Sequence, residues 1–177
     1  RGDTENNADW IAFADQILNV IISDGVTHIG EAAFYYCKNL ESVQLSQSIR
    51  SIGYCAFEGC CALVDISLPE GLETIGIAAF AHTGLTEIVI PESVRFLDAN
   101  AFMLSKVKNV LFKGNDLLMD VGAFIWCFDL EKVILPAKLT CLRDSIFSGC
   151  SSLTEIIIPD TVTVIESSAF GSCEGLS

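Results

Sequence analysis

The sequence predicts an α/β solenoid, in which the chain winds through stacked coils of 22 or 23 residues with a parallel sheet along one side. Two observations predict it: phenylalanine recurs every 22 or 23 residues, and short alternating apolar stretches recur with the same period. A fixed period of this size is typical of solenoids, in which a coil buries its apolar face only against its neighbours. The periodic phenylalanines are Phe34, Phe57, Phe80, Phe102, Phe124, Phe147 and Phe170.

The composition supports a packed domain and argues against several classes of protein. Of the 177 residues, 51% are hydrophobic and 19% are charged, which excludes a disordered chain. The 23 acidic residues outnumber the 10 basic ones, and the net charge of −13 argues against nucleic acids and anionic membranes as partners. No stretch reaches the roughly 18 consecutive apolar residues of a spanning helix, so we expect no membrane insertion.

An alternating stretch in each coil predicts its main strand. Val43-Gln44-Leu45 and Ile66-Ser67-Leu68 are examples, and a period of two turns every second side chain toward the core. Proline cannot donate a hydrogen bond to a strand ladder, and it therefore ends four of these strands. These prolines are Pro69, Pro91, Pro136 and Pro159.

A second apolar pair, such as Ile49 and Ile52, predicts a short extended piece after each main strand. Gly53 and Gly76 are then expected to permit a tight bend before the Ala-Phe pair. Short helical or 3₁₀ turns are expected around that pair, opposite the sheet. One coil lacks the proline and has Asp116 where others have Val or Leu, which predicts a local bulge.

The order of residues within a coil resembles the BspA-like leucine-rich repeat. The motif is seen in Ala33-Phe34, Cys37 and Leu40, and in Leu153 with Ile158-Pro159. The resemblance covers residues 17–177 and implies a right-handed leucine-rich-repeat coil with its parallel sheet on the concave side. Members of this family are typically secreted or cell-surface proteins linked with adhesion and host interaction, and they share no active site.

Two segments are expected along the chain. Residues 1–16 are predicted to form an amino-terminal capping segment, since Trp10, Phe13 and Ala14 fall at helical spacing, and residues 17–177 to form the solenoid. The last coil ends where another strand is due, so we expect a solenoid truncated at its carboxy-terminal end. Self-association through the edge of the last strand is the competing interpretation.

The cysteines and histidines predict packing rather than chemistry. Most cysteines share one repeat position, which favours buried free thiols over disulfides. They are Cys37, Cys60, Cys127, Cys150 and Cys173, whereas Cys55, Cys61 and Cys141 lie elsewhere. With no Cys-x-x-Cys pair and only two unrelated histidines, we expect no metal site. No catalytic or phosphate-binding motif is present, so we expect neither an enzyme nor a cofactor.

The candidate site consists of main-strand side chains that point away from the core. The second half of one outward column is aliphatic: Val89, Leu111, Ile134 and Ile157. Its flanks carry Glu87, Lys132 and Glu155. A contiguous apolar stripe with a charged rim often marks an interaction site. The alternative is that β-branched residues simply suit strands and that a flanking segment covers them.

The expected function is that of a non-enzymatic adhesion module, secreted or at the cell surface. Its exposed sheet face would bind a protein ligand, either an extracellular-matrix or another surface protein, or a second copy of the chain. The alternative is a structural spacer that presents a neighbouring catalytic or anchoring domain. Neither interpretation needs a cofactor or a nucleic acid.

Overall fold

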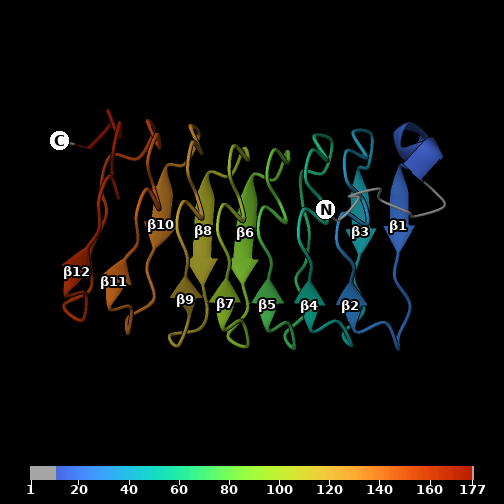
Figure 1. Ribbon diagram of the computed structural model, residues 1–177, viewed down its shortest axis with the longest axis horizontal. Coiled ribbons are helices and arrows are strands. Elements are labelled where there is room, and N and C mark those ends of the chain that lie inside the picture. The colour runs from blue at the N-terminus through green and yellow to red at the C-terminus, as the bar shows by residue number, and fades with distance from the viewer. Residues whose placement is uncertain (1–10, 177) are drawn as a thin grey trace, which may run out of the picture.

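The computed structural model describes residues 11–176, and they wind into a parallel β-solenoid (Figure 1). Coil follows coil along the long axis, from the blue amino-terminal end to the red carboxy-terminal end. Paired residues on neighbouring strands are one sequence period apart, as Asn19 and Ser42 or Glu87 and Asn109 are. The expected solenoid of 22- to 23-residue coils is confirmed.

Two series of strands run along the solenoid. The main strands are β1 (Asn19–Ile21), β3 (Ser42–Gln44), β6 (Glu87–Ile90), β8 (Asn109–Phe112) and β10 (Lys132–Ile134). The short strands are β2 (His28–Ile29), β4 (Ser51–Ile52), β5 (Thr74–Ile75), β7 (Phe96–Leu97), β9 (Leu118–Met119), β11 (Cys141–Leu142) and β12 (Val164–Ile165). We call the outward side of each series the main-strand face and the short-strand face.

All strand pairs in the described residues are parallel and join neighbouring coils. The main strands form the pair β1–β3 and the sheet β6–β8–β10, and the short strands form β2–β4–β5–β7–β9 and β11–β12. Residues 66–68, expected as a main strand, do not form one, and neither do the equivalent residues 154–158 of a later coil. Ile66 is nevertheless buried and Ser67 exposed, so the alternation of side chains persists there without the full ladder of hydrogen bonds.

Both series of strands bury their inward side chains in one core. Ile88 and Ile90 of β6 and Leu97 of β7 belong to the same buried cluster. The periodic phenylalanines stack through this core, with neighbouring ring centroids 5.2 to 5.8 Å apart and rings within 12° of parallel. The distance between ring centroids is larger than the distance of about 4.8 Å between adjacent strands, so neighbouring rings are offset from each other. Aromatic rings prefer such offset stacking over a face-to-face arrangement.

The third side of each coil is made of hydrogen-bonded turns, and the expected helical or 3₁₀ turns are not seen there. Around Phe102, the residues two before and two after it, Asn100 and Leu104, have positive φ values of 58° and 56°. All three donate their backbone N–H to the next coil, as Phe102 does to the Ala123 carbonyl at 2.9 Å. A helix cannot form because left-handed residues interrupt it and these donors bond across coils.

Glycine occupies positions 53 and 76 for a reason other than the expected freedom to bend. Neither has a positive φ. A Cβ on Gly53 would lie 2.9 Å from the carbonyl oxygen of Ile29, and one on Gly76 would lie 2.9 Å from that of Ile52. These glycines therefore allow close approach between coils, and the turns that follow them do not use, at the glycine itself, the positive φ that glycine permits.

The irregular coil differs from the others in the turn after its main strand. Strand β8 pairs without interruption with β6 and β10, so the expected bulge is not in the ladder. Instead, Leu117, one residue after the position that Val or Leu takes in other coils, is buried, and Asp116 is exposed. A carboxylate avoids an apolar core, so a shift of one residue here puts Leu117 inside and Asp116 on the surface.

The first described residues form a short 3₁₀ helix, η1 (Ile11–Gln16). Ala14 and Ile17 pack against the core, whereas Phe13 is exposed. Trp10, the first residue of the expected amphipathic helix, lies outside the described residues. The division at residues 16 and 17 stays a prediction. No helix within residues 11–176 has the length and apolar character needed to cross a bilayer.

Candidate protein-binding surface

The pairing of the main strands builds the stripe predicted from the sequence. Val89 of β6 is the register partner of Leu111 of β8, and Leu111 is that of Ile134 of β10. The three side chains are 42%, 43% and 52% exposed, whereas Ile88 and Val110 beside them are buried. Adjacent strands lie about 4.8 Å apart, so the three side chains form one contiguous apolar row on the main-strand face.

Ile157 occupies the same repeat position one coil further on, but it does not lie in a strand. Its side chain is 84% exposed, the most of the four. The structure therefore brings three of the predicted side chains together by strand pairing, and it leaves Ile157 outside the paired strands.

The charged flank lies in the neighbouring outward column. Glu87, Asn109 and Lys132 are register partners, and the Asn109 side-chain amide donates a hydrogen bond of 3.4 Å to Glu87. Glu155 is exposed in the following coil, outside the paired strands. This flank therefore has one acid and one base in the same sheet as the stripe.

Two shallow hollows lie along the stripe. One of about 280 Å³ lies over β6, β8 and β10 and is lined by Val89, Leu111 and Ile134. The other, of about 420 Å³, extends toward the amino-terminal coils and adds Glu70 and Lys113, which form an ion pair, to the lining. The main-strand face thus offers an apolar surface with charges at its edge and shallow hollows along it.

The eight cysteines are free thiols, which was expected for the five of the repeated position and was left open for Cys55, Cys61 and Cys141. Along the main cysteine column, a thiol donates to the phenylalanine carbonyl of the preceding coil. Cys127 does so to Phe102 at 3.1 Å and Cys150 to Phe124 at 3.3 Å. Burial raises the pKa of the Cys127 thiol to about 12 and raises that of Cys150 further, so both stay protonated donors at neutral pH.

No group of three or more His, Cys, Asp or Glu side chains in the described residues is placed to hold a metal ion. His28 Nδ1 lies 2.7 Å from the hydroxyl of Ser51 on the short-strand face. This contact joins neighbouring coils and accounts for the histidine as a surface side chain.

A second apolar column, which was not predicted from the sequence, lies on the short-strand face. Phe96 and Leu118 are register partners in β7 and β9 and are 49% and 66% exposed. Cys141 of β11 and Val164 of β12 take the same position in later coils. The signal was present in the sequence: Phe96, Leu118 and Cys141 each directly precede a buried strand residue, so alternation turns them outward.

The comparison with protein families decides what kind of repeat this is. The family described as the BspA type leucine rich repeat region, in six copies, matches residues 11–120 and 118–177. The chain belongs to this family. BspA-type repeats therefore account for nearly the whole described chain, including the phenylalanine stack and the cysteine column. No curated protein is significantly similar to the chain.

Solved bacterial proteins share the fold of this BspA-type chain. A leucine-rich repeat protein from Bacteroides ovatus is 33% identical with a TM-score of 0.65, over 92% of this chain and 37% of that one. A leucine rich cell surface protein from Faecalibacterium prausnitzii is 27% identical with a TM-score of 0.53, over 90% of this chain and 52% of that one. The T. pallidum leucine rich repeat protein is 25% identical with a TM-score of 0.62, over 92% of this chain and 79% of that one. The chain thus spans about a third to a half of the first two proteins.

Proposed function

We propose that this BspA-type chain is a non-enzymatic adhesion module that binds a protein ligand through its main-strand face. The observation that carries the proposal is the row of Val89, Leu111 and Ile134, which is exposed and contiguous by strand register. Strands of a soluble sheet usually turn polar side chains to water, so an aliphatic row with a charged flank favours contact with another protein.

Similarity to known proteins supports a location outside the cytoplasm. One relative, from Faecalibacterium prausnitzii, is described as a cell surface protein. We therefore propose that the chain is secreted or displayed at the cell surface, where an extracellular-matrix protein or another surface protein is the ligand. Its family is a repeat scaffold, which agrees with binding rather than catalysis.

The size of the stripe indicates how binding energy is distributed. Covering the exposed half of one aliphatic side chain contributes about 1 kcal/mol, so three give about 3 kcal/mol. Micromolar binding needs about 8 kcal/mol in total, so a ligand must contact several coils and the charged flank as well. Affinity is therefore spread along the main-strand face.

The test uses the double variant Leu111→Ser and Ile134→Ser in a binding screen against extracellular-matrix and surface proteins. Both side chains point outward, so we expect an unchanged melting temperature and about thirtyfold weaker binding, equivalent to about 2 kcal/mol. Surface plasmon resonance measures the affinities. A double variant that binds its ligand as tightly as the parent would contradict the proposal.

Ile21→Ser serves as the matched control. Ile21 occupies the same outward column and is exposed, but Gln44 and Ser67 separate it from the stripe. We expect this variant to bind like the parent chain. Binding of no protein in the screen would instead favour the structural spacer, and loss of a dimer in the double variant would identify a second copy as the partner.

A further inference from the structure

A hollow lies on the short-strand face, away from the proposed main-strand contact. It has a volume of about 630 Å³, and Phe96, Leu118 and Cys141 contribute to its lining. These side chains occupy the outward column of β7, β9 and β11, so they form an apolar floor across neighbouring coils. We call this hollow the short-strand groove.

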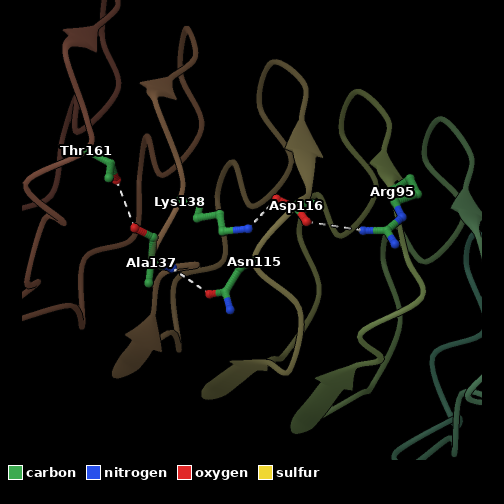
Figure 2. A network of polar contacts seen from close by, with 6 residues as sticks. All are labelled: Arg95, Asn115, Asp116, Ala137, Lys138 and Thr161. Atoms are coloured by element: carbon green, nitrogen blue, oxygen red, sulfur yellow. Dashed lines mark hydrogen bonds and ion pairs between the residues drawn. The ribbon is translucent and has the colours of Figure 1, made fainter.

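One row of charged side chains lies beside the floor (Figure 2). Asp116 pairs with Lys138 of the next coil at 3.2 Å and with Arg95 of the preceding coil at 3.9 Å. In the adjoining turn, the backbone N–H of Ala137 donates to the Asn115 side chain at 3.0 Å. The shift that exposes Asp116 in the irregular coil thus creates this row, which holds two cations and one carboxylate.

The second row consists of the residues that follow the short strands. Arg143 lies 3.6 Å from Asp120 and 3.8 Å from Glu166, its neighbours in the adjacent coils. Asp98 stands at the same position one coil before Asp120, and no cation of the described residues lies within ion-pair distance of it. The row therefore holds three carboxylates and one guanidinium.

Asp98 carries the least compensated charge of the groove. Burial, and then the charge of Asp120, raise the pKa of this carboxyl above its usual value. A positive charge placed beside both carboxylates would relieve this repulsion. In the opposite row, the charged side chains that line the groove, Asp116 and Lys138, pair with each other, so the uncompensated negative charge lies on the side of Asp98 and Asp120.

We propose that the short-strand groove is a second docking site, which binds a protein segment presenting an apolar side chain next to a lysine or arginine. The apolar side chain lies on Phe96 and Leu118, and the cation lies beside Asp98 and Asp120. Charge complementarity selects this occupant. Nucleic acid and a second copy of the chain, with its net charge of −13, would both be repelled.

This inference does not depend on the proposed main-strand contact. The two faces belong to different sheets that enclose the same core, so their outward side chains point in different directions. A chain with both sites would hold two segments of one ligand, or two ligands, at once. Variants of one face are therefore internal controls for the other.

In the experiment, the whole chain is titrated with a synthetic peptide in which lysine and phenylalanine alternate. Isothermal titration calorimetry measures the affinity. We expect binding, and about tenfold weaker binding for Asp98→Asn and for Leu118→Ser. Both side chains reach the surface, so folding is retained, and thermal unfolding verifies this for each variant. Backbone amide NMR shifts on titration are expected in β7, β9 and β11.

Controls separate the groove from general attraction to an acidic protein. Glu41→Gln removes the same charge from an exposed position elsewhere, and Leu111→Ser removes an apolar side chain from the main-strand face. Both variants should bind the peptide like the parent chain. If Asp98→Asn and Glu41→Gln weakened peptide binding equally, the proposal would be overturned. Equal binding of a peptide with serine in place of phenylalanine, or of one with glutamate in place of lysine, would also overturn it.

Discussion

At the residue scale, Asp98 shows how a surface charge in this chain affects stability. Its carboxyl has a raised pKa in the folded chain, first because it is partly buried and second because Asp120 lies nearby. Between the ordinary pKa of aspartate and this raised value, the folded state binds more protons than the unfolded state. Stability therefore falls as the pH rises through that window, and it stays lower above it.

Asp98→Asn removes this titration. We expect the variant to unfold at a higher denaturant concentration than the parent at neutral pH, because the uncompensated charge is gone. The advantage should shrink as the pH falls through the raised pKa, where the parent carboxyl becomes neutral. Urea unfolding at a series of pH values measures this difference in stability between variant and parent. Glu41→Gln, at an exposed position, serves as the control. A variant that is less stable than the parent at neutral pH would contradict this account.

At the scale of one element, the turn around each phenylalanine combines a buried ring with cross-coil hydrogen bonds. Phe102 stacks on Phe80 and Phe124, both at 5.3 Å, and is fully buried. Among residues 11–176, Phe170 stacks on Phe147 alone, at 5.8 Å, and it is half-buried. A phenylalanine in the middle of the stack therefore contributes more to stability than the last phenylalanine of the stack.

Phe102→Ala is expected to destabilise the chain by about 3–5 kcal/mol, since it opens a cavity between two rings. That is a large part of the about 5–15 kcal/mol that holds a domain of ordinary size folded. Phe170→Ala should have a clearly smaller effect, because its site is open on one side. Chemical unfolding of both variants measures the difference, and equal losses would be evidence against a stack that depends on neighbours.

At the scale of the whole molecule, stability depends on how many coils cover a given coil. The buried residue of β11, Leu142, has no exposed surface, whereas the equivalent Ile165 of β12 is 53% exposed. Solenoids are approximately one-dimensional, so a coil covered on one side loses about half of its neighbour contacts. Within residues 11–176, we therefore expect the coil of β12 to be less stable than the coils around Phe102.

Native-state hydrogen exchange tests this gradient. The amide of Phe102 donates to Ala123, but among the described residues the amide of Phe170 has no carbonyl partner. We expect amides of the last coil to exchange about a hundredfold faster than those around Phe102 and Phe124, equivalent to about 3 kcal/mol. Uniform protection along the solenoid would show instead that the chain unfolds as a single unit.

The sequence by itself determined the period, the core and the direction of most side chains. A phenylalanine every 22 or 23 residues needs a buried slot in every coil, and alternation of apolar and polar residues decides which side faces water. These patterns were enough to place Val89, Leu111 and Ile134 on one exposed row. They also predicted free thiols for the five cysteines of the repeated inward position, because one small side chain recurs there.

Only the tertiary structure decided what depends on contact between coils. The turns around the phenylalanines are not helical because their amides bond to the next coil, and Gly53 is small because Ile29 of the preceding coil lies against it. The short-strand groove likewise needs Asp116, Lys138 and Arg95 from three different coils. A local pattern gives the face on which a side chain lies, but its partners on that face are set by stacking, which joins residues a full period apart.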